Sequence, residues 1–390
     1  MIYRSVSTVI IMIKGMKNLI FIFLVLFFLT GCAQQGKRYG DGGFSGFTTL
    51  FQPGVDSLVE CYRIPAICTA PNGDLIAAID ERVPSCEDLR SNPDINIVIR
   101  RSSDNGVSWS NCETIVDYPL GQSASDPSLI VDHQAGIVFL LYNFMDLTRE
   151  KDVYYFRVIQ STNHGKSWSD PVDITAQITK PEWKYDFKFI TSGRGIQTQN
   201  GKLLHTLVNL NNGLHVFGSD DHGEQWYLLD TPLTPGDESK IVELANGAWM
   251  VNSRTHGTGF RYVHISSDEG KSWISFPDSV LVDPGCNASL LRYSYSEDGT
   301  QRNRLLFANA KSKSERINLT IRMSYDDGKS WPVEKTIYPG RAAYASLTLL
   351  SGGDIGLFFE KDDYRSCAFV RFSMDWLTDR KETPSIQPLK

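Results

Sequence analysis

Residues 102–109, SSDNGVSW, form the stretch that decides the fold, because it recurs four more times along the chain. The copies follow the pattern S-x-[DN]-x-G-x-[SQ]-W and lie at 161–168, 219–226, 266–273 and 324–331. Their starts are separated by 59, 58, 47 and 58 residues. Repetition at a period of tens of residues is typical of solenoids and propellers.

Each copy has the chemistry of a turn. An aspartate or asparagine side chain accepts hydrogen bonds from nearby backbone N–H groups, and the glycine two residues later adopts positive φ without strain. The tryptophan is a large apolar anchor that fixes the turn to its sheet. Extended runs precede most copies, for example 95–99 and 317–321. The repeats therefore predict hairpin turns that are structural and carry no chemistry.

Composition bounds the class of protein. The chain has 390 residues, of which 41% are hydrophobic and 11% aromatic, as in a soluble globular protein. Its formal charge of −6 argues against nucleic acid or an anionic membrane surface as a partner.

The N-terminus reads as a targeting segment. Lys17 precedes an apolar run at 19–29, and the motif LTGC ends at Cys32. This motif resembles the lipobox of bacterial lipoproteins, which implies cleavage before Cys32 and its lipidation. We expect a signal peptide at 1–32, a polar tether at 33–45, and export to the periplasm or a lipid anchor in the outer membrane. An ordinary secretory signal is the alternative, and Met16 could be the natural start.

The cysteines fit export. Six remain beside Cys32, and six cysteines allow 15 pairings between which the sequence does not choose. No C-x-x-C pair or histidine cluster suggests a metal site, and we expect no cofactor.

Short β runs joined by Asn-Gly and Gly-Gly turns fill the rest of the chain. Strands at regular spacing with a repeated turn favour an all-β, six-bladed β-propeller of four-stranded antiparallel sheets over residues 46–385. The N-terminal strand would complete the last blade.

Arg63-Ile64-Pro65, just upstream of an Asn-Gly hairpin and of the five repeats, resembles the signature of the sialidase (neuraminidase) superfamily with its Asp-box, or BNR, repeats. The resemblance covers roughly residues 50–375. It implies that Arg63 is one of three arginines that bind the sugar carboxylate. The planar guanidinium fits a carboxylate in a bidentate manner and stays charged.

The segment from Arg82 to Asp94 resembles the acid/base loop of that family. The resemblance assigns Asp88 as general acid/base and Arg82 as a further substrate-binding arginine. Glu87 and Asp94 are the competitors of Asp88 for this role.

The segment 238–254 resembles the part of the family that has a glutamate before a hairpin and the second carboxylate-binding arginine at the end of the far strand. Glu243 and Arg254 match these two residues. Glu238 lies nearby, but in a strand its side chain would face away from the side that Glu243 occupies. Arg316 matches the third carboxylate-binding arginine, with Arg322 as competitor.

Near the C-terminus, Tyr344 matches the family's nucleophile, and Glu360 the carboxylate that orients Arg63. The roles of two further segments remain unassigned. The segment 125–128, SDPS, has no assigned role. Arg194 stands where the family often has proline, which puts substrate contacts there in doubt.

Together these residues imply a retaining exo-α-sialidase. Sialidases use a tyrosine nucleophile where most glycosidases use a carboxylate. We expect Glu243 to take the proton of Tyr344, and Asp88 to protonate the leaving oxygen and then activate water. The expected partners are sialylated glycoproteins, glycolipids or oligosaccharides, bound by a monomer. The alternatives are a non-catalytic glycan-binding protein with Asp-box repeats and a trans-sialidase, ordinary or intramolecular.

Overall fold

The computed structural model describes residues 43–55, 57–296 and 302–381, which belong to one compact unit, Tyr39–Lys390. The expected leader with Cys32, and most of the expected tether, lie outside the described residues. Strands dominate, and the helical elements α1 (Thr175–Ile178), η1 (Pro181–Trp183) and α2 (Met374–Leu377) have four residues or fewer. The expected all-β class is therefore confirmed. Among the described residues, no helix has the length and apolarity needed to span a bilayer.

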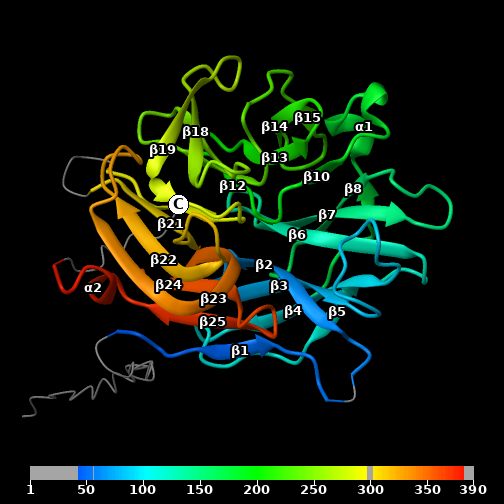
Figure 1. Cartoon of the computed structure of the whole chain (residues 1–390), viewed down its shortest axis with the longest axis horizontal. Coiled ribbons are helices and arrows are strands. Elements are labelled where there is room, and N and C mark those ends of the chain that lie inside the picture. The colour runs from blue at the N-terminus through cyan, green and yellow to red at the C-terminus, as the bar shows by residue number, and fades with distance from the viewer. Residues whose placement is uncertain (1–42, 56, 297–301, 382–390) are drawn as a thin grey trace, which may run out of the picture. The chain divides into compact units, whose positions relative to one another are not determined.

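The strands form five sheets (Figure 1). The first contains β2 (Cys61–Thr69), β3 (Leu75–Arg82), β4 (Ile95–Ser102) and β5 (Glu113–Val116). The second contains β6 (Gln122–Asp132), β7 (Ile137–Asp146), β8 (Tyr155–Ser161), β9 (Val172–Asp173) and β11 (Gly193–Arg194). The third contains β10 (Lys188–Ile190), β12 (Ile196–Gln197), β13 (Leu203–Asn209), β14 (Gly213–Ser219) and β15 (Tyr227–Leu228).

The fourth sheet contains β16 (Ser239–Glu243), β17 (Trp249–Ser253), β18 (Phe260–Ser266) and β19 (Ile274–Val282). The fifth runs in the order β1-β25-β24-β23-β22-β21-β20. Its strands are β1 (Thr48–Phe51), β20 (Ser289–Ser294), β21 (Arg304–Ala310), β22 (Ile317–Ser324), β23 (Val333–Leu349), β24 (Ile355–Lys361) and β25 (Ser366–Phe372).

The expected six-bladed β-propeller of four-stranded antiparallel sheets is wrong, because two sheets have four strands, two have five and one has seven. One reason is β23, a 17-residue strand whose first part pairs with β22 and whose last part pairs with β24, so that two groups of strands become one sheet. Another reason is β11, which joins β6 in parallel. The N-terminal β1 pairs with β25, so the first and last strands lie side by side in Figure 1.

The five repeats form hairpin turns, as the sequence predicted. In the first copy, Ser102 Oγ accepts from Gly106 N at 2.8 Å, and Asp104 Oδ1 accepts from Ser108 N at 2.8 Å. The bond from the glycine N–H to the serine hydroxyl recurs in the other four copies. The glycine has positive φ in every copy. These bonds satisfy backbone donors that a bare turn would leave to water.

The tryptophan of the third repeat shows how a turn packs against the core. Trp226 is 5% exposed, and its ring centroid lies 6.0 Å from that of Phe139 on β7 and 5.8 Å from that of Phe217 on β14. The turn thus joins two neighbouring sheets through one aromatic cluster. Burial of each such side chain contributes about 1.5–3 kcal/mol.

Short polar side chains also link strands, both between the first and fifth sheets and within the fifth sheet. Ile67 N on β2 donates to Ser346 Oγ on β23 at 3.2 Å, and Leu347 N on β23 donates to Ser289 Oγ on β20 at 3.0 Å. These bonds fix strands that are far apart in sequence relative to one another.

Three strands carry a register shift where the candidate residues lie. The shifts fall between residues 63 and 66 on β2, 125 and 128 on β6, and 342 and 345 on β23. Bulges of this kind redirect side chains and are common beside active sites.

Candidate active site

Arg63 and Glu360 form a buried ion pair between β2 and β24. Arg63 Nε donates to Glu360 Oε1 at 2.7 Å. The same carboxylate accepts from Ile64 N at 2.9 Å and from Tyr344 N at 3.0 Å. Burial lowers the pKa of Arg63, but the charge and hydrogen bond of Glu360, together with Tyr344 and Tyr364, outweigh burial and raise the pKa, so the guanidinium stays charged.

Tyr344 forms the centre of the site, and its partner is Glu238. Tyr344 Oη donates to Glu238 Oε2 at 2.8 Å. Arg254 Nη1 forms an ion pair with the same carboxylate and lies 3.3 Å from Tyr344 Oη. Arg254 Nε also lies 3.4 Å from Asp237 Oδ2. The phenol is thus held between a carboxylate that can accept its proton and a guanidinium.

The expectation that Glu243 takes the proton of Tyr344 is wrong. The Glu243 carboxylate accepts from Gln199 N at 2.7 Å and from Tyr295 Oη at 3.3 Å. Glu243 stands at the far end of β16, five residues from Glu238, which is roughly 17 Å along an extended chain.

Strand register explains why Glu238, and not Glu243, meets Arg254. In the antiparallel pair β16 and β17, Ser239 lies opposite Ser253 and Glu243 lies opposite Trp249. The next pair along the ladder is Glu238 and Arg254, and Arg254 N donates to Glu238 O at 3.0 Å. Counting outward from the Asn-Gly turn of this hairpin is the signal that could have identified Glu238 from sequence.

Arg316 lies near Tyr344, whereas Arg322 does not belong to the site. Arg316 Nη1 donates to Tyr364 Oη at 3.0 Å, and its guanidinium carbon lies 5.4 Å from the centroid of the Tyr344 ring. Arg322 is instead buried within its sheet, where it donates to Glu334 Oε2 at 2.9 Å and to Asn309 Oδ1 at 2.9 Å.

Three arginines therefore surround one phenol. The guanidinium carbon of Arg63 lies 5.8 Å from the centroid of the Tyr344 ring, and Arg254 and Arg316 approach it as described above. Burial raises the pKa of Tyr344, and the charge of Glu238 raises it further, whereas Arg254 and Arg316 lower it. The phenol is consequently neutral until a base removes its proton.

Asp88 lies on an exposed loop that a buried arginine holds. The Asp88 side chain is 84% exposed and that of Arg82 is 1% exposed, yet Arg82 Nη1 donates to Asp88 Oδ1 at 2.7 Å. Arg82 Nη2 also pairs with Asp80 Oδ2 at 3.0 Å. Asp80 lies opposite Arg63 across β2 and β3, so this loop belongs to the same end of the sheet as Arg63.

The rest of the loop favours Asp88 over its competitors. Glu87 contributes its backbone oxygen to Arg82 at 3.2 Å. Asp94 accepts from Asn96 Nδ2 at 3.3 Å. The disulfide Cys61–Cys86 ties the loop to the start of β2. In the described part of the chain, the other four cysteines are free thiols, namely Cys68, Cys112, Cys286 and Cys367.

Asp126 is a half-buried carboxyl beside this loop for which the sequence suggested no role. It has a φ of +62° at the bulge of β6. Its N–H donates to Asp80 Oδ1 at 2.9 Å, and its Oδ2 accepts from Asn143 Nδ2 at 2.9 Å. Burial and then the charge of Asp80 raise the pKa of Asp126.

Arg194, where the sequence left substrate contacts open, donates to the Leu347 carbonyl at 3.2 Å and so contacts the backbone of β23.

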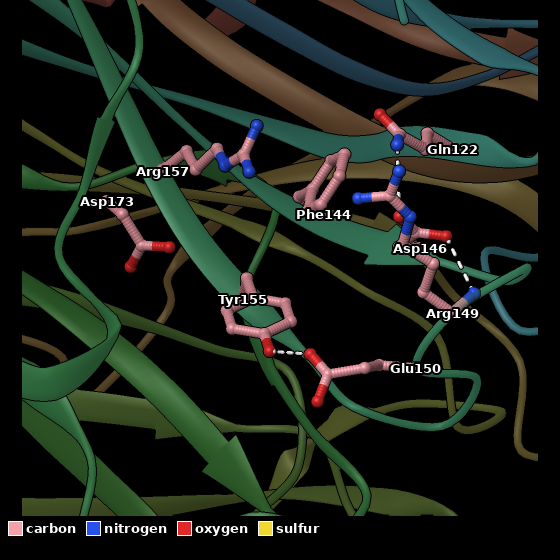
Figure 2. Close-up of a pocket in the computed structure, with 8 residues that line it drawn as sticks. All are labelled: Gln122, Phe144, Asp146, Arg149, Glu150, Tyr155, Arg157 and Asp173. Atoms are coloured by element: carbon pink, nitrogen blue, oxygen red, sulfur yellow. Dashed lines mark hydrogen bonds between the residues drawn. The ribbon is translucent and has the colours of Figure 1, made fainter. Parts of the chain in front are cut away.

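A separate surface pocket of about 340 Å³ contains none of these residues (Figure 2). In it Arg157 lies over the ring of Phe144, 3.7 Å from its centroid, and Tyr155 donates to Glu150. Its lining consists of Gln122, Phe144, Asp146, Arg149, Glu150, Tyr155, Arg157 and Asp173.

Comparison with known proteins identifies the family of the chain. The BNR repeat-like domain family matches residues 88–357. A sialidase from Micromonospora viridifaciens is 34% identical over 346 residues, which are 81% of this chain and 52% of the relative. Hadza microbial sialidase Hz136 has a TM-score of 0.72 at 25% identity, over 82% of this chain and 67% of that chain. The intramolecular trans-sialidase from Ruminococcus gnavus, solved with oseltamivir carboxylate, has a TM-score of 0.74 at 20% identity, over 90% of this chain and 100% of that chain.

The chain spans about half the length of the Micromonospora relative. The family match nevertheless covers more than half of this chain and includes all five repeats. The chain therefore belongs to the BNR-repeat family within the sialidase superfamily.

Proposed function

We propose that this protein is a retaining exo-α-sialidase that hydrolyses terminal sialic acid from glycoproteins, glycolipids or oligosaccharides. The observation that carries the proposal is the hydrogen bond between Tyr344 and Glu238, surrounded by Arg63, Arg254 and Arg316.

The three arginines would bind the substrate carboxylate. Sialic acid carries this group on the anomeric carbon, next to the bond that breaks. Guanidinium groups bind carboxylates through paired, charge-assisted hydrogen bonds. Glu360 supports this role because it fixes the direction of Arg63 from below the exposed part of the site.

Tyr344 would be the nucleophile. A carboxylate nucleophile would be repelled by the substrate carboxylate, whereas a neutral phenol is not. Glu238 would take the phenol proton as the bond to the anomeric carbon forms, which a phenol with a raised pKa requires.

Asp88 would act as general acid and then as general base. Its exposed position suits a group that meets first the leaving oxygen and then water, and Arg82 holds its direction. Two inversions at the anomeric carbon, one through Tyr344 and one through water, give net retention.

Variants at both residues test the proposal. Asp88→Ala should lower the kcat for sialyl-lactose about 10²–10⁴-fold, the usual contribution of a positioned acid/base. Tyr344→Phe should also abolish most of the turnover. Asp94→Ala and Tyr295→Phe are matched controls that should stay close to wild type. Wild-type rates in Asp88→Ala and Tyr344→Phe would refute the assignment.

Product analysis separates the remaining outcomes. Proton NMR of a fresh reaction should show the α-anomer of free sialic acid first. An anhydro-sugar or a sialylated acceptor would indicate a trans-sialidase instead. Binding of sialyl-lactose without turnover would indicate a glycan-binding protein.

We also propose that the protein works as a monomer outside the cytoplasm, anchored through Cys32. The Cys61–Cys86 disulfide supports an oxidising compartment. Labelling with radioactive palmitate should be lost in Cys32→Ser, and equal labelling of both forms would count against the anchor.

A further inference from the structure

Arg261 is a buried guanidinium that the proposed mechanism leaves without a role. It lies on β18 and is 0% exposed. Its Nη1 donates to the Cys286 carbonyl at 2.8 Å and lies 3.4 Å from Asp283 Oδ2. Its Nη2 donates to the Glu238 carbonyl at 3.4 Å, and its Nε donates to Asn252 Oδ1 at 2.8 Å. One side chain thus joins the residue of the proposed base to a segment that is distant in sequence.

The segment that this guanidinium binds is the turn DPGC at residues 283–286. Asp283 Oδ1 accepts from Gly285 N and from Cys286 N, both at 2.9 Å. Asp283 Oδ2 accepts from Asn309 Nδ2 on β21 at 3.0 Å. Gly285 has a φ of +77°, which glycine adopts without strain. The turn is therefore fixed from within by its own aspartate and from outside by side chains of β18 and β21.

The same turn lies against two arginines and the phenol of the candidate site. The Gly285 carbonyl accepts from Arg316 Nη2 at 3.3 Å. A Cβ built on Gly285 would lie 4.0 Å from Arg254 Nε, so the backbone of the turn lies beside this arginine too. Cys286 packs in one buried cluster with Tyr344. A displacement of the turn would therefore move Arg316 relative to the phenol.

We propose that Arg261 is a positioning residue that fixes the carboxylate-binding Arg316 relative to the base Glu238. It reaches Arg316 through the turn, and it reaches Glu238 through the backbone carbonyl of that residue. A guanidinium suits this role because its rigid, planar group of N–H donors binds several acceptors at once. Asp283 supplies the counter-charge that a buried cation needs. Arg261 would not touch the substrate. The inference rests on the proposed function, which assigns Glu238 and Arg316 their roles.

The first test compares Arg261→Met with Arg292→Met, because both changes replace a buried guanidinium by an unbranched apolar side chain. Arg292 is 8% exposed. It donates to the Glu243 carbonyl at 3.0 Å, at the other end of β16, and pairs with Asp327 Oδ1 at 2.7 Å. The kcat/KM for sialyl-lactose should fall about 10²-fold in Arg261→Met, a loss that a misplacement of about 1 Å can cause. It should stay close to wild type in Arg292→Met.

A binding experiment without turnover examines the carboxylate site itself. The probes are 2,3-didehydro-sialic acid and its methyl ester, which differ only at the group that the arginines would bind. Calorimetry gives the ratio of their affinities. This ratio should fall about tenfold in Arg261→Met, because a charge-assisted hydrogen bond from Arg316 would be misdirected. A general loss of stability would weaken the binding of both probes alike, so the ratio separates positioning from support of the fold. The ratio should be unchanged in Arg292→Met.

A second pair of variants covers the case in which Arg261→Met does not fold. Asp283→Asn keeps the shape of the side chain and an acceptor for the N–H groups of the turn, but its amide would meet the donors of Arg261 and Asn309. Asp327→Asn makes the same change at the partner of Arg292. The affinity ratio should fall in Asp283→Asn and not in Asp327→Asn. An unchanged ratio in Asp283→Asn, or in folded Arg261→Met, would overturn the proposal.

The two experiments also distinguish this inference from the proposed function. If the wild type prefers the acid to the ester but releases no sialic acid, only the proposed function fails, and a lower ratio in Arg261→Met still supports the inference. If the wild type hydrolyses sialyl-lactose and Arg261→Met matches it in rate and ratio, only the inference fails. Equal binding of acid and ester by the wild type would overturn the carboxylate-binding role of the arginines and this inference with it.

Discussion

Replacement of Glu238 by glutamine is the sharpest perturbation of the site. Glutamine keeps the shape of the side chain and can still receive the 2.8 Å hydrogen bond from Tyr344 Oη, but its amide oxygen is too weak a base to take the proton. Arg254 retains Asp237 as an ionic partner at 3.4 Å. The fold should therefore survive while the chemistry fails.

The expected loss follows from the proposed role of Glu238 as general base. Such a group contributes about 10²–10⁴-fold to the rate, and each factor of ten corresponds to about 1.4 kcal/mol of barrier. Glu238→Gln should thus lower kcat for a fluorogenic sialoside by this factor, with a smaller change in KM. Circular dichroism and thermal melting should show a folded protein.

Glu243→Gln is the matched control, since it makes the same chemical change five residues along the same strand. Its carboxylate serves Gln199 N and Tyr295 Oη, so only stability should respond. If Glu243→Gln lost activity while Glu238→Gln kept it, the assignment of the base would be refuted.

Two further predictions concern stability. Gly223→Ala should lower the free energy of unfolding by about 2–4 kcal/mol in urea, because its Cβ would meet the Phe139 ring at 2.5 Å at a φ of +84°. Gly247→Ala, with a similar φ of +81° and no atom within 4 Å, should lose only about 1 kcal/mol, and equal losses would contradict the packing explanation. Reduction of Cys61–Cys86, which closes a segment of 25 residues, should cost about 3.5 kcal/mol by loop entropy, and a Cys61→Ala/Cys86→Ala variant should not respond to reductant.

The sequence predicted local features well. The repeated turn was identified because its bonds join residues within one stretch of eight, such as Ser102 and Gly106. Arg63, Tyr344 and Glu360 were singled out by their motifs, and the structure brings them together. Such features depend on neighbours in sequence or on a recognisable pattern.

Features that depend on strand register were less accessible. Glu243 was preferred over Glu238 because alternation along a strand was counted without fixing where the hairpin turns. The seven-stranded sheet was not predicted, because β23 continues through Pro339 and Gly340 by irregular pairing with β22 and so joins two groups of strands. Pairing over such distances is decided by packing between sheets, which no local pattern records.

The contacts of the Glu360 carboxylate determine when the site can assemble during synthesis of the chain. This carboxylate binds Arg63 across 297 positions of the chain and Tyr344 across 16, so neither group can be oriented before β24 has been synthesised. A nascent chain that ends before Glu360 would already contain the other residues of the site, but Arg63 and Tyr344 would not yet be held in place. The proposed hydrolysis of sialosides could therefore begin only after β24 has folded against β2 and β23.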